Sequence, residues 1–248
     1  MDKIDKKEAM KSFFSAEDTA KGFEDIDQST MAIPFLKIAQ ALSPEMKENK
    51  PEYIPGLKLG DMFNNVTQEI YGKEINIIIG KFEHGYTEWL PMRKGFVGNH
   101  TVEEAISLAE DKTFGKWKTA EGNILQENYV YYVIVEGREE QGVLIMLLSS
   151  SQIKKAKKLN KILTSYVMPN GEKAMPYYLR WNVKTVEEHK DENDWYGYSF
   201  TCLGLIQNEK QYLAVKEERK LIDTRVVDYS NMIEDHTSED SDEGDTGF

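Results

Sequence analysis

The segment Ile124–Leu148, ILQENYVYYVIVEGREEQGVLIMLL, decides the fold class. Two apolar runs, Ile124–Val135 and Gln141–Leu148, flank the polar stretch Glu136–Glu140. Runs of this length that are rich in valine, isoleucine and tyrosine are typical of buried strands. A short polar connection between two such runs is typical of an antiparallel hairpin. We therefore expect a mainly β protein built around this hairpin.

Other segments extend this pattern on both sides. We predict further strands at Glu74–Phe82 (EINIIIGKF), Tyr86–Met92, Pro176–Val186 and Trp195–Gln207. A turn at His84-Gly85 is expected to join the first two, and the charged stretch EEHKDEND is expected to be a loop between the last two. Helices are predicted at Ala105–Ala109, after a capping box at Thr101–Glu104, and at Gln152–Tyr166, and the segment Gln211–Arg225 has mixed helical signals.

The order of these elements predicts the architecture. Five or six strands without an alternating βαβ pattern favour a mainly β fold with α additions, namely an OB-fold-like antiparallel β-barrel. A β-sandwich is the alternative. We expect a flexible N-terminal arm at residues 1–30, a core domain at residues 31–228 and a disordered acidic tail at residues 229–248.

Composition excludes several classes of protein. The chain has 248 residues and a formal net charge of −12. Its single cysteine, Cys202, excludes a disulfide framework and a cysteine zinc cluster. The longest aliphatic run, Val143–Leu148, is far shorter than the roughly 20 residues that a membrane span needs. The charged start, MDKIDKKEAM, lacks a signal peptide, so we expect a cytoplasmic protein without membrane contact.

Charge is partitioned along the chain. The segment from Ser150 to Thr185 holds eight Lys or Arg residues and one acid, Glu172. The first 27 residues hold eight acids against five lysines, and the segment from Glu234 to Phe248 holds seven acids and no Lys or Arg. The negative net charge by itself argues against a polyanionic ligand. The basic centre between acidic ends is the stronger observation, and it indicates a surface that binds a polyanion.

The predicted helix Gln152–Tyr166 carries most of the basic centre. At 100° per residue its apolar side chains gather on one side and its lysines on the other. The lysines are Lys154, Lys155, Lys157, Lys158 and Lys161, and no acid stands three or four residues from any of them. Like charges at this spacing repel, and a polyanion relieves the repulsion. The alternative is an ordinary solvated helix face.

Two further clusters combine aromatic and basic side chains. In the predicted strand Pro176–Val186, period 2 places Tyr178, Arg180, Asn182 and Lys184 on one face, while Trp181 falls on the core face. The second cluster contains Trp89, Arg93, Lys94 and Phe96. Rings stack on bases and cations bind phosphates, so both clusters are candidates for contact with single-stranded nucleic acid. An exposed β face and a plain turn with Trp89 in the core are the alternatives.

The chain ends in DEGDTGF, an acidic segment with an aromatic last residue. This ending resembles the single-stranded DNA-binding proteins of bacteria and tailed phages, and most of all the phage replication type. The segments IPFLKIAQALSPE and GDMFNNVTQEIYG also look like those of phage proteins. The resemblance implies an OB-fold core and a tail that recruits polymerase, helicase or primase. The tail residues concerned are Asp240, Asp242, Glu243, Asp245 and Phe248.

Enzyme motifs are missing from the sequence. It has neither GxxxxGK[ST] nor GxGxxG, and its four histidines are scattered. We therefore expect no catalytic residue, no metal and no cofactor, although acidic pairs such as Glu187-Glu188 leave a metal-dependent nuclease open.

The sequence thus predicts a phage-encoded protein of the host cytoplasm that coats single-stranded DNA in replication or recombination. The alternative is an acidic interaction protein that regulates a replication or host enzyme. A homo-oligomer is left open.

Overall fold

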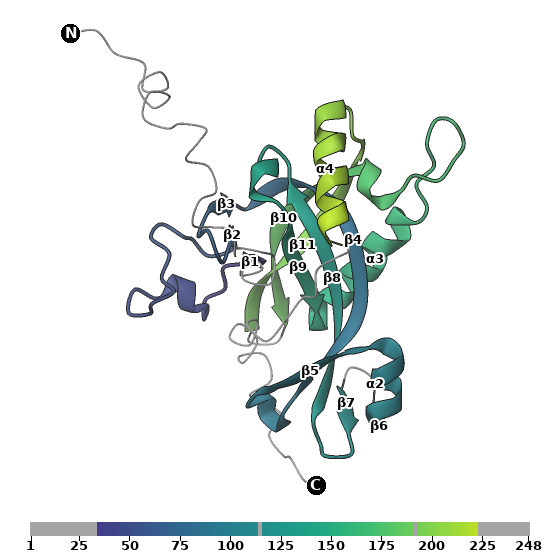
Figure 1. Cartoon of the computed structure of the whole chain (residues 1–248). Helices are drawn as coiled ribbons and strands as arrows, with labels where there is room; N and C mark the ends of the chain where they lie inside the picture. Colours follow the sequence, from purple (N-terminus) through teal and green to yellow (C-terminus); the bar gives the residue numbers. More distant parts are fainter. Residues whose placement is uncertain (1–33, 114–115, 191–192, 223–248) are drawn as a thin grey trace, which may run out of the picture. The chain divides into compact units, whose positions relative to one another are not determined.

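The computed structural model describes residues 34–113, 116–190 and 193–222 (Figure 1). The predicted arm at residues 1–30 and the predicted tail at residues 229–248 lie outside the described residues. The predictions for these two segments therefore stay predictions.

The described part is mainly β, with antiparallel sheets and a few helices, as predicted. The strands of the larger sheet are β4 (Glu74–Trp89), β5 (Phe96–Thr101), β6 (Ala109–Thr113), β7 (Lys116–Thr119), β8 (Ile124–Val135), β9 (Leu144–Ser149), β10 (Leu179–Lys190) and β11 (Asn193–Leu205). The smaller sheet contains β1 (Leu36–Ile38), β2 (Met62–Asn64) and β3 (Ile70–Gly72). The α-helices are α2 (Val102–Leu108), α3 (Ile153–Leu163) and α4 (Glu209–Ile222).

Two long strands, β4 and β8, form the centre of the larger sheet. They pair antiparallel from Ile77 opposite Val135 to Trp89 opposite Ile124. At one end of this ribbon the strand order is β11-β10-β4-β8-β9, and at the other it is β5-β4-β8-β7-β6. The sheet does not close into the predicted OB-type barrel within the described residues, because β11 and β9 at one end, and β5 and β6 at the other, remain edge strands that do not pair with each other. The sandwich-like alternative describes the arrangement better.

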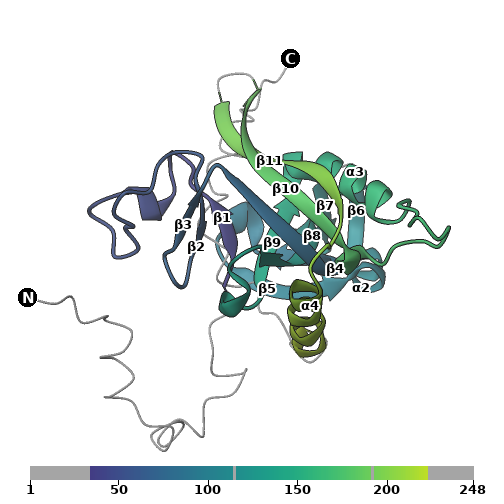
Figure 2. The same ribbon diagram turned by 90° about the horizontal axis from the view of Figure 1, so that it is seen from above.

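Both faces of the β4–β8 ribbon are covered where β9 and β10 flank it. Alternate residues of β8 belong to two cores: Tyr131 and Val133 to the first, and Tyr132 and Ile134 to the second. Helix α3 and the small sheet complete the first core, and Val215 of α4 completes the second. Figure 2 shows α3 and α4 on opposite sides of the sheet. Burial on both faces explains why the apolar runs in this sequence are nearly continuous rather than alternating.

The predicted turn at His84-Gly85 is wrong. Strand β4 runs through both residues and joins the two predicted strands into one. Glycine is needed at position 85 for a different reason: a Cβ there would lie 2.9 Å from the carbonyl oxygen of His100 on β5. The missing side chain lets a neighbouring strand approach closely, and does not make a turn.

The predicted loop EEHKDEND is also wrong. Strand β10 continues to Lys190 and β11 begins at Asn193, so the described residues of this stretch belong to the paired strands of a long hairpin. The predicted strand Pro176–Val186 begins only at Leu179, because Pro176–Tyr178 form a 3₁₀ turn, and the predicted strand Tyr86–Met92 ends at Trp89. The hairpin of β8 and β9 is present, Thr101 and Glu104 form both bonds of the capping box, and helices occupy the three segments with helical signals.

One residue of β4 changes which face of the sheet the later side chains of the strand point to. The pairing register with β8 shifts between Ile79 and Lys81, so Gly80 is an extra residue in the manner of a β-bulge. Before the bulge, Ile77 and Ile79 face the first core. After it, Phe82 takes this face and packs against Tyr129 and Tyr131. Such a shift by one residue moves every later side chain to the other face.

Replacing Gly85 tests why β4 stays extended there. We expect Gly85→Ala to lower the free energy of unfolding by about 1–3 kcal/mol, because the methyl group overpacks against the β5 backbone. Gly98→Ala is the matched control on β5, since a Cβ there would meet only the His100 ring, at 3.9 Å. Urea unfolding measures both variants. Equal stability of the two would contradict the close strand approach.

Candidate nucleic-acid interface

Helix α3 is positioned by three buried side chains on one side: Ala156, Leu159 and Leu163. The hydroxyl of Tyr131 on β8 donates to Asn160 Oδ1 at 2.8 Å and to the Ala156 carbonyl at 3.2 Å. These contacts fix the rotation of the helix on the sheet. Lys154, Lys157, Lys158 and Lys161 are consequently exposed, and we refer to these four residues as the α3 cationic face.

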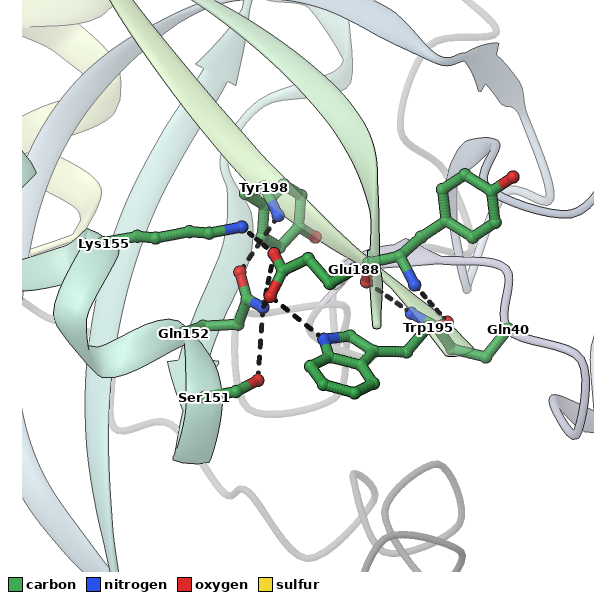
Figure 3. A network of polar contacts seen from close by, with 8 residues as sticks. Gln40, Ser151, Gln152, Lys155, Glu188, Trp195 and Tyr198 are labelled. Atoms are coloured by element: carbon green, nitrogen blue, oxygen red, sulfur yellow. Dashed lines mark hydrogen bonds and ion pairs between the residues drawn. The ribbon is translucent and has the colours of Figure 1, made fainter. Parts of the chain in front are cut away.

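Lys155, the fifth predicted lysine, points elsewhere. It forms an ion pair with Glu188 of β10, and burial lowers the pKa of its ammonium group. Glu188 also accepts hydrogen bonds from the Trp195 indole at 3.2 Å and from the Gln152 amide (Figure 3). Gln152 in turn accepts from the Tyr198 backbone N–H at 3.0 Å. Lys155 therefore joins α3 to the β10–β11 hairpin and is not available to phosphate in this structure.

The predicted face of strand β10 is only partly present. Tyr178 precedes the strand, in a 3₁₀ turn at Pro176–Tyr178, and contacts Tyr177 and Tyr212. Arg180 donates two hydrogen bonds to the Glu136 carboxylate, at 2.7 and 2.8 Å. Lys184 is exposed but pairs with Glu74 at 3.0 Å. Each of the two cations already has a carboxylate partner.

Trp181 is fully buried in the first core and is unavailable for stacking on a base, which corrects its place among the predicted contacts. The period-2 alternation of the predicted strand had already placed Trp181 on the core face.

The third predicted cluster lies at the other end of the ribbon. Trp89 is buried and packs edge-on against Phe96, with ring centroids 5.8 Å apart. Trp89 is opposite Ile124 on β8, seven residues from Tyr131, where α3 docks. At 3.4 Å per residue this separation is roughly 24 Å. The structure therefore does not bring Trp89, Arg93, Lys94 and Phe96 next to the α3 cationic face.

Aromatic residues that the sequence analysis did not select lie closer to α3. Phe82, His84 and Tyr86 of β4, Tyr129 of β8 and Trp117 of β7 share the face on which α3 packs, and we call these five residues the aromatic face. Adjacent ring centroids are 4.6–6.0 Å apart. The sequence pattern that could have indicated this face is the alternation of Phe82, His84 and Tyr86. It was missed because a turn was predicted at His84-Gly85.

Two carboxylates accompany the aromatic face. Glu127 Oε1 lies 3.0 Å from His84 Nε2, and Glu88 Oε2 lies 2.7 Å from His100 Nε2. Burial, together with the Glu127 carboxylate, raises the pKa of Tyr86 and of Tyr129 to about 12 each. Both phenols therefore stay neutral at physiological pH, and the rings add no negative charge to this surface.

The remaining predicted positions carry less information. The tail residues Asp240, Asp242, Glu243, Asp245 and Phe248 lie outside the described residues. Cys202 is half-buried and packs against the first core. In the described ranges, no three His, Cys, Asp or Glu side chains come together as metal ligands would. Among the same residues, none of the helices combines the length and apolar character of a membrane span.

Comparison with known proteins gives one result. A family model described as Pam3 phage gp34-like protein matches residues 5–227. The chain belongs to this family. Membership in the Pam3 phage gp34-like family supports the predicted phage origin and covers all of the described residues. Neither a curated protein nor a solved structure matches the sequence.

The Arg180–Glu136 pair gives a test of stability. Arg180 holds the pKa of Glu136 below its ordinary value, so the pair stabilises the fold above a pH of about 4.3 and loses this effect as Glu136 protonates. Both side chains are mostly buried, so we expect Arg180→Met to cost about 1–2 kcal/mol at pH 7. The deficit should shrink as the pH falls below about 4.

Lys184→Met is the matched control, because its pair with Glu74 is exposed and should contribute little. Urea unfolding at several pH values measures both variants. A loss of DNA affinity in Arg180→Met at unchanged stability would instead assign Arg180 to phosphate binding.

Proposed function

We propose that this protein binds single-stranded DNA, with the α3 cationic face in contact with phosphates. The observation that carries the proposal is the set of four exposed ammonium groups on α3. None of these lysines forms a salt bridge with any residue that the structure describes. The proposal includes a role in coating and protecting the strand during replication or recombination.

The contrast with other basic residues supports a polyanionic ligand. Lys155, Arg180 and Lys184 each have a carboxylate within ion-pair distance. The chain has 43 acids against 31 Lys and Arg residues, so partners for the α3 lysines were available in its composition. A helix face that lacks them carries a repulsion that bound phosphates remove. Release of counterions from the nucleic acid then favours binding.

The acidic C-terminal segment has a regulatory role in this proposal. Residues 234–248 hold seven acids and follow the family match, which ends at residue 227. A tethered polyanion competes with phosphate at a high effective concentration. When DNA displaces the segment, Phe248 and its acidic neighbours become available to polymerase, helicase or primase. This is the mode of recruitment that the resemblance in the tail implies.

An assay with a fluorescent oligo-dT strand, with and without magnesium, separates this proposal from its alternatives. Binding without cleavage supports the single-stranded DNA-binding protein. Cleavage that requires magnesium supports a nuclease, and the absence of both supports an acidic interaction protein.

Loss of two α3 lysines should weaken binding in a salt-dependent way. For single strands, log K falls with log salt by about 0.7 per phosphate contact. We expect Lys157→Gln/Lys161→Gln to reduce this slope by about 1.4 and to lower affinity at low salt. Fluorescence anisotropy between about 50 and 200 mM salt measures the slope.

Lys50→Gln/Lys58→Gln is the matched control. Both lysines are exposed and lie in the connection between β1 and β2. Their replacement removes the same charge as the double substitution on α3. An equal change in slope for the two double variants would mean that net charge, not the α3 face, determines binding.

Removal of residues 234–248 should tighten DNA binding, because a competing polyanion is lost. The effect should be largest at low salt, where electrostatic competition is least screened. A variant in which the seven acids of this segment become Asn or Gln is the matched control for length, and it should bind as tightly as the truncated chain. Unchanged affinity in both variants would exclude a competitive role for the tail.

A further inference from the structure

Part of the aromatic face is accessible between two helices. Helix α3 covers the β4–β8 ribbon at Tyr131, and Ala105 of α2 covers the same face at Tyr86 and Leu125. Figure 1 shows both helices on the same side of the ribbon, one above the other. Between them Phe82 is 37% exposed, and the side chain of His84 is 31% exposed. Two rings are therefore presented on a rigid strand, with Tyr129 packed between them.

This strip lies beside part of the α3 cationic face. The Phe82 ring is 5.0 Å from the Tyr131 ring, and the Tyr131 hydroxyl bonds to Asn160 of α3. At 100° per residue, Lys157 is about 60° from Asn160 around the helix and Lys161 about 100°, whereas Lys154 and Lys158 are about 120° and 160° away. Lys155 lies on the opposite flank, where it meets Glu188. Of the four exposed lysines, Lys157 and Lys161 are therefore the two closest in angle to Asn160, the residue of α3 to which Tyr131 is bonded.

We propose that Phe82 and His84 form a base-stacking platform for a single strand whose phosphates lie on Lys157 and Lys161. This inference rests on the proposed function. It adds a contact for the bases of the strand, which the lysines do not bind. Rings beside a cationic track are the combination by which single-stranded nucleic acid is bound without sequence preference. We therefore assign base stacking to residues of β4, in place of the residues predicted from the sequence, which were Trp89, Phe96, Tyr178 and Trp181.

Charge on the strip sets the orientation of the strand. Glu127 lies beside His84, so phosphates are repelled from this part of the surface, whereas neutral bases are not. The backbone of the strand therefore follows α3 and its bases point toward β4. Bases inside a duplex are stacked on one another and cannot reach the rings. The platform consequently selects single strands over duplexes, and accepts all four bases because each has a π-face.

The test replaces the ring and keeps its apolar bulk. Phe82→Leu retains a side chain against Tyr129 and Tyr131, so folding is preserved while stacking is lost. We expect the full-length variant to bind an oligo-dT strand at least about five-fold more weakly, since stacking contributes about 1–3 kcal/mol per base. The salt slope should stay unchanged, because no phosphate contact is removed.

Phe96→Leu is the matched control, since Phe96 is also partly accessible, also packs against an aromatic side chain, and lies at the other end of the ribbon. It should bind as the parent does. Photo-crosslinking to an oligonucleotide that carries 5-iododeoxyuridine gives a second readout, with adducts expected on the peptide that contains Phe82 and His84.

The outcomes distinguish this inference from the proposed function. If Lys157→Gln/Lys161→Gln weakens binding while Phe82→Leu does not, and no adduct forms on β4, the platform is excluded and the phosphate track stands. If the parent protein fails to bind the oligo-dT strand, both proposals fail. Equal losses in Phe82→Leu and Phe96→Leu would place stacking outside this strip and overturn the inference.

Discussion

The rest of the described structure depends on the antiparallel pairing of β4 with β8. This ribbon is longer than any other strand pair in the larger sheet except the β10–β11 hairpin, and all other strands of that sheet are added to its two edges. Its isoleucine, valine and tyrosine side chains are buried on both faces and belong to both hydrophobic cores. Full burial of one such aliphatic side chain is worth about 1.5–3 kcal/mol, so a central two-faced strand pair can hold two otherwise separate ends together.

The bulge at Gly80 links this scaffold to the proposed function. On one side of it, alternate residues of β4 are aliphatic and fill the first core under α3. On the other side, the alternate residues on that face are Phe82, His84 and Tyr86. If Gly80 were instead paired in regular register, Lys81 and Glu83 would occupy these positions. A single unpaired glycine therefore keeps the aromatic residues of β4, rather than Lys81 and Glu83, on the face that α3 packs against.

Ion pairing divides the basic residues into two groups with different roles. Carboxylates elsewhere in the fold pair with Lys155, Arg180 and Lys184, and these pairs join β10 to α3, to the residue that follows β8 and to β4. The lysines of the α3 cationic face have no such partner among the described residues, because the buried side of the helix and the Tyr131 hydrogen bond turn them outward. The same residue type thus serves the fold in one place and is free for a ligand in another. Membership in a phage protein family is compatible with a ligand of this kind.

The sequence by itself determined the mainly β class, the hairpin of β8 and β9, the capping box at Thr101 and the amphipathic character of α3. Each of these depends on neighbouring residues, through periodicity, apolar runs or local hydrogen bonds, and such signals can be read along one chain. Only the tertiary structure decided that Lys155 and Arg180 are paired, that Trp181 is inaccessible, and that Phe82 packs against Tyr131, which is bonded to Asn160 of α3. These facts depend on strand register and on contacts between residues 30 or more positions apart. A glycine that signals a turn and a glycine that admits a neighbouring strand look the same in sequence, since only the position of the neighbour distinguishes them.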